Sequence, residues 1–182
     1  MTFNCELLTL NLIILLMGPA GSGKTTVGEL LAAQLQWEFA DGDNFHSPAN
    51  VEKMSRGIPL TDDDRIPWLN SIREAMLQWN AQQRNVVLAC SALKRSYREL
   101  LQINSNVKLV YLKGSSELFR ERLRTRKGHY AGVQILAGQF ADLEEPADAI
   151  TIDAAESPEQ IVAEIRKRLA LSEDAPLAGA EL

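Results

Sequence analysis

The chain of 182 residues is poor in cysteine: it has only two, Cys5 and Cys90, far apart in the sequence. They have neither the paired spacing of a metal site nor the density of a disulfide scaffold, so neither is expected to hold a metal. Cys90 lies in an apolar run, where a buried thiol is expected. This cysteine usage suits a reducing cytosol, and we expect a cytoplasmic protein.

An excess of positive charge is also missing. Asp and Glu outnumber Lys and Arg by 24 to 19, which gives a formal net charge of −5. No overall basic field attracts nucleic acid, so any anionic ligand must be held by local groups of Arg and Lys. A nucleic-acid partner is therefore not expected.

No apolar run is long enough to cross a membrane. Leu7–Met17 is too short and lacks a basic flank, so it is better interpreted as a buried strand, and no membrane association is expected. Repeats and low-complexity linkers are absent too. The length then favours one domain over residues 1–182, with a core from about 10 to 170, a frayed start over 1–6 and a flexible tail over 172–182.

Strand-like apolar segments alternate with segments of helical periodicity along the chain. This alternation predicts a parallel sheet covered by helices. The strand-like segments are Leu12–Met17, Trp37–Ala40, Val86–Cys90, Val107–Leu112 and Ala149–Ile152.

Capping residues mark several helix starts, at Ser47, Thr61 and Ser157. From Trp68 to Trp79, apolar residues recur at steps of three and four. Both tryptophans are therefore expected in the core, with no ligand role.

One short stretch carries specific chemistry. The segment "LIILLMGPAGSGKTTVGELL" fits the pattern G-x-x-x-x-G-K-[ST] between an apolar strand and a helix. Glycines let successive N–H groups point at one anion beside the positive end of a helix, so the segment predicts a nucleotide phosphate site. Lys24 would reach the β- and γ-phosphates, and the Thr25 hydroxyl would bind Mg²⁺. The expected cradle comprises Gly18, Ala20, Gly21, Ser22, Gly23, Lys24, Thr25 and Thr26.

The second strand-like segment ends in "ADGDNFH", which places Asp41, Asp43 and His46 at the same edge of the sheet. One aspartate would support the magnesium ion with Thr25, and the other would accept a hydrogen bond from an attacking hydroxyl. The third strand, "VVLACSALK", has no aspartate where many such proteins keep a metal-supporting acid, so Asp41 is the expected substitute. The alternative is a pair of turn aspartates beside a glycine.

Two basic segments follow later strands. Lys94 and Arg98 lie four residues apart and would converge on one anionic group. Arg122 and Arg126 are spaced in the same way, which places them in one row along a helix. One such row of arginines would stack on an adenine and reach across the triphosphate. A lid over about 124–142 would close on the nucleotide and exclude water. For both segments the alternative is a solvated basic face.

Together these motifs resemble the gluconate kinases, P-loop small-molecule kinases related to shikimate and adenylate kinases. The resemblance covers nearly all of residues 12–169. It rests on "GPAGSGKTT", "DGDNFHSPANVEKMSRGIPLTDDDRIPWL", "CSALKRSYRELL", "YLKG" and "RLRTRKGHYAGVQILAGQFADLEEP".

The resemblance implies a three-layer α/β/α fold with a five-stranded parallel sheet in the order 2-3-1-4-5 and a short lid. It also implies phosphorylation of D-gluconate to 6-phosphogluconate by ATP with Mg²⁺, and it suggests a homodimer. The chain departs from the family at Tyr130, Ala131 and Gly138, and these departures concern the packing of the lid.

Site roles follow from the matched positions. Lys24, Asp43 and Arg126 are the expected catalytic residues, with Asp43 orienting the acceptor hydroxyl. The acceptor is expected to contact Asp43, His46, Arg65, Lys94 and Arg98, and the nucleotide to contact Arg122 and Arg126 besides the phosphate cradle. The alternatives are a shikimate or other sugar-acid kinase, a nucleoside monophosphate kinase, and an ATP-gated binding or switch module without enzymatic activity.

Overall fold

The computed structural model describes residues 11–125 and 130–171 and contains a five-stranded parallel sheet. Its spatial order is β2-β3-β1-β4-β5, which confirms the order 2-3-1-4-5 expected from the resemblance. All four neighbouring pairs run parallel. The strands are β1 (Ile13–Met17), β2 (Glu38–Asp41), β3 (Val86–Ala89), β4 (Val107–Lys113) and β5 (Ile150–Asp153).

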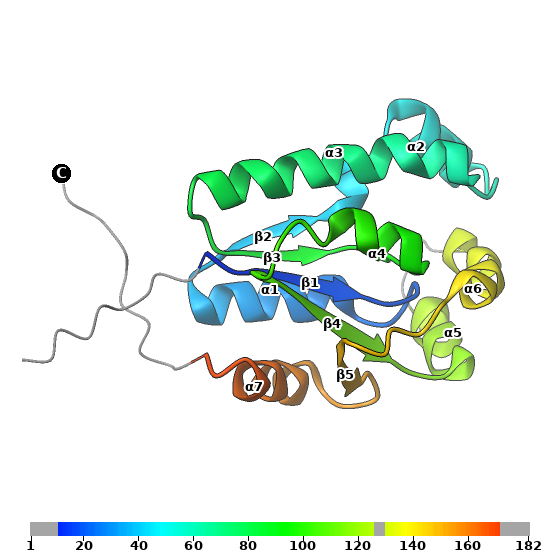
Figure 1. Cartoon of the computed structure of the whole chain (residues 1–182). Coiled ribbons are helices and arrows are strands. Elements are labelled where there is room, and N and C mark those ends of the chain that lie inside the picture. The colour runs from blue at the N-terminus through cyan, green and yellow to red at the C-terminus, as the bar shows by residue number, and fades with distance from the viewer. Residues whose placement is uncertain (1–10, 126–129, 172–182) are drawn as a thin grey trace, which may run out of the picture.

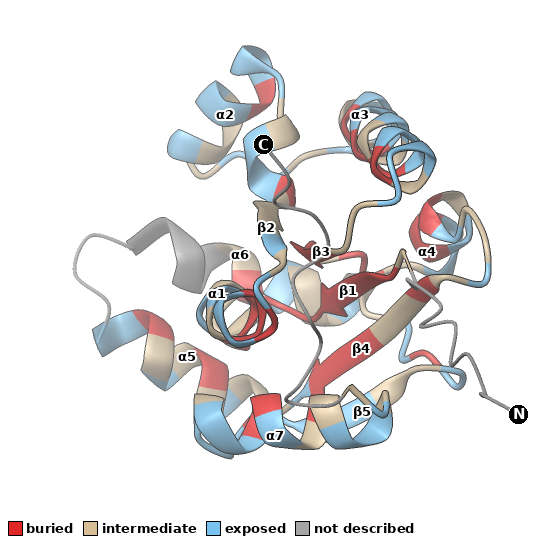
Figure 2. Cartoon of the chain, turned by 90° about the vertical axis from the view of Figure 1, so that its left-hand side faces the viewer, coloured by how far each residue is buried: buried red, intermediate tan, exposed pale blue. Residues whose placement is uncertain are grey.

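The central strand β1 is buried on both faces, which explains its unbroken run of apolar residues. Ile14 and Leu16 belong to one core cluster, while Ile13, Leu15 and Met17 belong to another. This division follows the alternation of side chains along a strand, so each face of the sheet carries its own core. Figure 2 shows the buried strands in the middle of the molecule.

Helices cover both faces of the sheet. On one face, α1 (Lys24–Leu35), α5 (Ser116–Thr125) and α7 (Pro158–Arg168) supply the first core cluster. On the other face, α3 (Asp62–Ala81) and α4 (Arg95–Leu101) supply the second. This three-layer α/β/α arrangement is visible in Figure 1 and is the fold that the resemblance implied.

The remaining helices lie toward the end to which the strand arrows point in Figure 1. They are the 3₁₀ helix η1 (Gly42–Phe45), α2 (Pro48–Ser55) and α6 (Tyr130–Asp142). Because carboxyl ends of parallel strands form the ligand-binding edge of such sheets, these elements surround the expected site.

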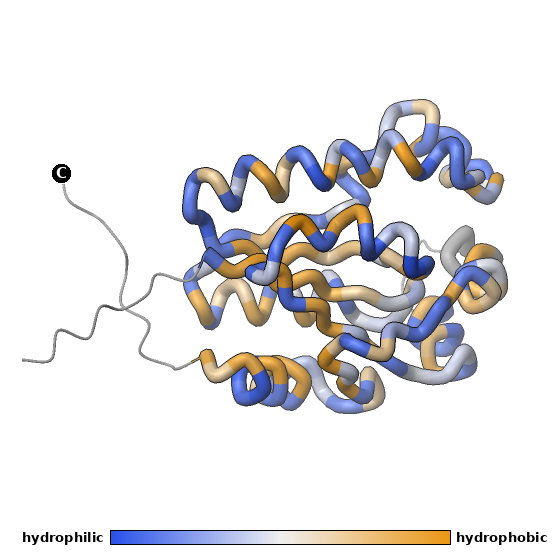
Figure 3. The backbone as a smooth tube through the Cα atoms, in the orientation of Figure 1, coloured by the Kyte–Doolittle hydropathy of each residue, from blue (hydrophilic) through white to orange (hydrophobic). Residues whose placement is uncertain are grey.

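The predicted helix starts are confirmed. Ser47 caps α2, and Thr61 and Ser157 form capping boxes at α3 and α7. Trp68 and Trp79 on α3 are buried, as their spacing predicted. Figure 3 shows the apolar residues concentrated in the strands and on the helix sides that face them.

Two expectations about the rest of the chain can be compared with the structure. No helix among the described residues has the length and apolar character needed to span a membrane. Cys90 is buried, as expected, and burial raises the pKa of its thiol to about 12. Cys5, the first residues and the tail over 172–182 lie outside the described residues.

Candidate active site

The turn from β1 into α1 is tightly packed against the chain around it. Gly18 has a φ of 149°, and a Cβ there would lie 2.9 Å from the Ser22 Oγ and 3.0 Å from the carbonyl oxygen of Leu112. Gly21 has a φ of 80°, and its Cβ would lie 2.7 Å from the Phe119 carbonyl oxygen. A side chain at either position would meet backbone in a conformation that disfavours it, so glycine is required there.

The first turn of α1 is left available for an anion. Gly23 precedes the helix with a φ of 97°, and no side chain among the described residues caps the first N–H groups. Lys24 donates from its Nζ to the carbonyl oxygens of Gly18 and Pro19, at 2.8 and 2.9 Å. This combination of uncapped N–H groups, a positive helix end and an ammonium group is suited to bind phosphate.

The turn and α1 open onto a cavity of about 1080 Å³. Among the expected cradle residues, those from Ala20 to Thr26 line it, while Gly18 lies behind them and contributes its carbonyl to Lys24. The same cavity is lined by residues from η1, α3, α4, α5 and α6. Groups that would contact nucleotide and groups that would contact an acceptor therefore share one space.

Asp41 and Thr25 lie next to each other at the carboxyl end of β2. The Thr25 hydroxyl donates to Asp41 Oδ2 at 3.2 Å, while Asp41 Oδ1 accepts from the backbone N–H of Asp43 at 3.0 Å. A hydroxyl and a carboxylate are oxygen ligands suited to Mg²⁺, which keeps several waters and binds phosphates as well. The described residues contain no group of three or more His, Cys, Asp or Glu that could hold a metal, so phosphate and water would complete its shell.

Asp43 projects from η1 into the cavity and remains open to solvent there. Partial desolvation by the cavity walls raises the pKa of its carboxyl above the ordinary value, and the negative charge of Asp41 raises it further. Lys24 and His46 oppose this shift. Both aspartates line the cavity, and Asp41 also caps η1 through the Asp43 N–H, as a turn aspartate does.

His46 is fixed against α3. Its ring stacks on Trp68 with centroids 4.4 Å apart and planes 11° apart, and Trp68 donates from Nε1 to the Gly42 carbonyl at 2.7 Å. Burial lowers the pKa of His46, which keeps the imidazole neutral near pH 7. Its Nδ1 is buried without a hydrogen-bond partner among the described residues.

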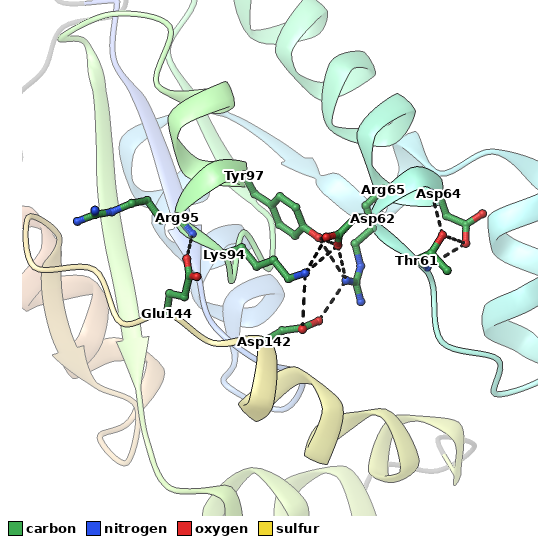
Figure 4. A network of polar contacts seen from close by, with 9 residues as sticks. All are labelled: Thr61, Asp62, Asp64, Arg65, Lys94, Arg95, Tyr97, Asp142 and Glu144. Atoms are coloured by element: carbon green, nitrogen blue, oxygen red, sulfur yellow. Dashed lines mark hydrogen bonds and ion pairs between the residues drawn. The ribbon is translucent and has the colours of Figure 1, made fainter.

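A network of charges occupies another part of the cavity (Figure 4). Lys94 donates to both carboxylate oxygens of Asp62, at 2.8 and 2.9 Å, and the Tyr97 hydroxyl donates to the same carboxylate. Arg65 Nη1 lies 3.4 Å from Asp62 and 3.1 Å from Asp142 at the end of α6. Lys94 Nζ is 3.8 Å from Asp142. These five side chains are the acid-site network.

Electrostatics follow from these contacts. Hydrogen bonds from Lys94 and Tyr97 lower the pKa of Asp62, and the hydrogen bond to Asp62 raises the pKa of Lys94. Both groups are therefore charged at neutral pH. Arg65 and Lys94 meet at one place, as expected for a site that binds an anion.

Arg98 is a correction to the expected site. Its side chain is buried, does not line the cavity, and donates from Nη1 to the carbonyl oxygens of Ala92 and Leu93, at 3.1 and 2.7 Å. Lys94 and Arg98 do not come together, although they lie four residues apart. Lys94 precedes α4 as its N-cap residue, and the Arg98 side chain turns inward. Arg98 holds the loop between β3 and α4.

The arginines of α5 are only partly described. Arg122 lines the cavity and donates to the carbonyl oxygen of Ala154 at 2.7 Å. Arg126 lies outside the described residues, so its expected role stays a prediction. The expected lid corresponds to the end of α5, residues 126–129 outside the description, and α6. A Cβ at Gly138 on α6 would meet no atom within 4 Å, so this departure from the family leaves open space.

Sequence reasoning missed several residues of the cavity. Trp68 is predicted only as a core residue, and Tyr97 carries no predicted role, yet each also positions a polar group of the site. Asp62 carries no predicted role either, and nothing distinguishes Gln139 and Asp142. Their helical spacing of three residues was a signal that they share a face of α6.

Comparison with known proteins places this architecture in a class. The family model described as shikimate kinase matches residues 20–170. Together with the sheet order and the uncapped turn before α1, this match defines the chain as a P-loop kinase that phosphorylates an alcohol group.

More similar relatives narrow the class. The thermoresistant gluconokinase of Escherichia coli strain K12 is 42% identical over 83% of this chain and 89% of its own length. A gluconokinase structure from Sinorhizobium meliloti 1021 is 38% identical, with a TM-score of 0.76 over 88% of this chain and 97% of that one. A sugar kinase structure from Janibacter has a TM-score of 0.82 at 38% identity, over 89% and 96%. The chain belongs to the gluconokinase family.

The assignment of Arg98 generates a prediction. Arg98→Met should lower the free energy of unfolding by about 1–3 kcal/mol, because the carbonyl groups of Ala92 and Leu93, two buried residues, each lose a hydrogen bond from the guanidinium. Urea denaturation measures this change. Arg95→Met, on the exposed side of the same helix, is the matched control and should change the free energy by less than about 0.5 kcal/mol. Unchanged stability together with weakened acceptor binding would return Arg98 to the acceptor site.

Proposed function

We propose that the protein transfers the γ-phosphoryl group of ATP to the terminal hydroxyl of D-gluconate, giving 6-phospho-D-gluconate and ADP. The observation that carries the proposal is that one cavity joins the uncapped start of α1 to the cation pair of Arg65 and Lys94. A phosphate donor and a carboxylate-bearing acceptor would therefore meet in one space. The gluconokinase names of the relatives support this acceptor.

The phosphate groups of ATP would bind the N–H groups of the turn, with Lys24 on the β- and γ-phosphates. Arg122 at the cavity wall would contact the nucleotide, and Arg126 would reach the transferring group. When bound, Mg²⁺ would neutralise charge on the phosphates, held by Thr25 and Asp41. Because the transition state of phosphoryl transfer is loose, positioning and charge neutralisation supply most of the catalysis.

Asp43 would orient the acceptor hydroxyl and accept its proton. Its carboxyl lies in the cavity near Lys24 and His46, which act on its pKa. The acid end of gluconate would bind Arg65 and Lys94, and neutral His46 would hydrogen-bond a hydroxyl. The remainder of the proposal is a cytoplasmic homodimer that binds neither nucleic acid nor membrane.

Asp43→Asn should lower turnover by roughly 10²–10⁴-fold, the range for a positioned acid–base group. The affinity for a non-hydrolysable ATP analogue, measured by titration calorimetry, should remain close to that of the unchanged protein. Near-normal turnover in the variant would remove Asp43 from this role.

The pH dependence of kcat/KM gives a second test of Asp43, because kcat/KM reports ionisations of the free enzyme. The carboxylate is the active form, so kcat/KM should fall as the pH falls through the pKa of Asp43. Since that pKa is raised, the fall should occur above the ordinary aspartate value of about 3.9. Steady-state rates across the acid range, in buffers of constant ionic strength, measure it. A kcat/KM that stays flat down to about pH 4 would contradict the assignment.

Lys94→Met should raise the Michaelis constant for gluconate by roughly tenfold or more, since a charged hydrogen bond is worth about 1.5–3 kcal/mol. The Michaelis constant for ATP should change far less. Lys113→Met is the matched control, because Lys113 pairs with Glu145 at 2.8 Å and does not line the cavity. Equal effects on both substrates would argue against an acid site at Lys94.

Acceptor identity is tested by ADP release with gluconate, shikimate, glycerate and nucleoside monophosphates side by side. Gluconate should give the highest kcat/KM. Faster transfer to shikimate or glycerate would indicate another sugar-acid or hydroxy-acid kinase, and transfer to a nucleotide a nucleoside monophosphate kinase. ATP binding without stimulation by any acceptor would favour a switch module.

A further inference from the structure

Helix α6 places two side chains on two different parts of the cavity. The Gln139 side-chain oxygen accepts a hydrogen bond from the backbone N–H of Ala20, at 2.6 Å. Three residues later, the Asp142 carboxylate lies 3.1 Å from Arg65 and 3.8 Å from Lys94. Residues three apart share one face of a helix, so a single face of α6 contacts both the phosphate turn and the acid-site network.

Each contact occupies a group that a substrate would need. The Ala20 N–H belongs to the turn that would hold phosphate, and the Gln139 oxygen accepts its hydrogen bond. The Asp142 carboxylate lies against Arg65 and Lys94, where the carboxylate of a sugar acid would bind. Figure 4 shows Asp142 facing both cations from the end of α6.

The charges of the acid-site network explain why one aspartate must leave. Arg65 and Lys94 contribute two positive charges, and Asp62 and Asp142 contribute two negative charges. A third carboxylate entering this neutral group would gain little Coulomb attraction and would be repelled by the two aspartates. Removing one aspartate restores a net positive charge for the acceptor.

Of the two aspartates, Asp142 is held less strongly. Asp62 accepts hydrogen bonds from Lys94 and Tyr97 and is also contacted by Arg65. Among the described residues, the Asp142 side chain has one hydrogen bond, from Arg65, and a longer ion pair, with Lys94. The backbone N–H of Glu144 is bonded to the Leu93 carbonyl at 3.0 Å, so the chain just beyond α6 is held to the loop before α4.

We propose that Gln139 and Asp142 are positioning residues that stand in for the two substrates and are displaced together. Phosphate displaces Gln139 from Ala20, α6 turns, and Asp142 leaves Arg65 and Lys94 free to bind the acceptor carboxylate. Each substrate thereby increases the affinity for the other, by the same factor in both directions. The inference rests on the proposed function in taking a sugar acid as the acceptor.

The test is titration calorimetry of gluconate with and without a non-hydrolysable ATP analogue and Mg²⁺. In the unchanged protein the analogue should tighten gluconate binding by about fivefold or more. Asp142→Asn should tighten gluconate binding without the analogue and reduce the coupling factor toward one. Gln139→Ala should tighten binding of the analogue alone and reduce the same factor. Asp148→Asn, which makes the same change on the loop beyond α6, should behave as the unchanged protein.

Steady-state kinetics give a second measurement, which a purely structural role of Asp142 would not change. In Asp142→Asn, the Michaelis constant for gluconate should fall more at low ATP than at saturating ATP, where the nucleotide has already displaced α6. Weaker gluconate binding in Asp142→Asn, or an unchanged coupling factor in both variants, would overturn the inference. If the unchanged protein phosphorylates gluconate but both variants keep its coupling factor, the inference is refuted and the proposed function stands. If gluconate is not phosphorylated at all, the proposed function fails. Asp142→Asn is then titrated with the acceptor that the substrate panel identifies. Tighter binding of that acceptor with a reduced coupling factor supports the inference, and weaker binding or an unchanged coupling factor overturns it.

Discussion

The close packing of the turn between β1 and α1 is the constraint on which the site depends. Carbonyl groups of Leu112 and Phe119 lie so near Gly18 and Gly21 that no side chain fits at either position. The turn before α1 therefore has no side chain at these two positions. The helix begins without a side-chain cap from the described residues. N–H groups that a side-chain cap would satisfy in another helix face the cavity instead, and Lys24 adds its charge beside them. Other elements of the cavity lie around this fixed point.

On the opposite side of the cavity, the positive charges of arginine and lysine side chains are balanced by aspartates. Cations there are not isolated, because Arg65 and Lys94 are each paired with aspartates of the protein. Pairing keeps the two cations close together, which their mutual repulsion would otherwise oppose. The same pairing means that an acceptor must compete with the carboxylates of the protein. Affinity at such a site reflects the difference between two sets of ion pairs, rather than the strength of one.

Much of the fold and part of the site could be predicted from the sequence because they depend on local patterns. Strands, capped helix starts and the phosphate turn follow from spacing. The pairing of Thr25 with Asp41 follows because both residues lie at the carboxyl edge of the sheet. Contacts that depend on how distant segments meet could not be predicted. Arg98 turns to loop carbonyls that its helical spacing does not reveal. Asp142 reaches Arg65 only because α6 folds back over the end of the sheet.

The sheet separates the two sets of binding groups into different layers. The nucleotide turn leads into α1, on the face covered by α5 and α7, whereas Arg65 and Lys94 belong to α3 and the start of α4 on the opposite face. Each face has its own core, so residues on one can change without repacking the other. Such a division lets natural selection exchange one half while the other persists. It offers a physical reason why one kind of phosphate turn can serve kinases with different acceptors.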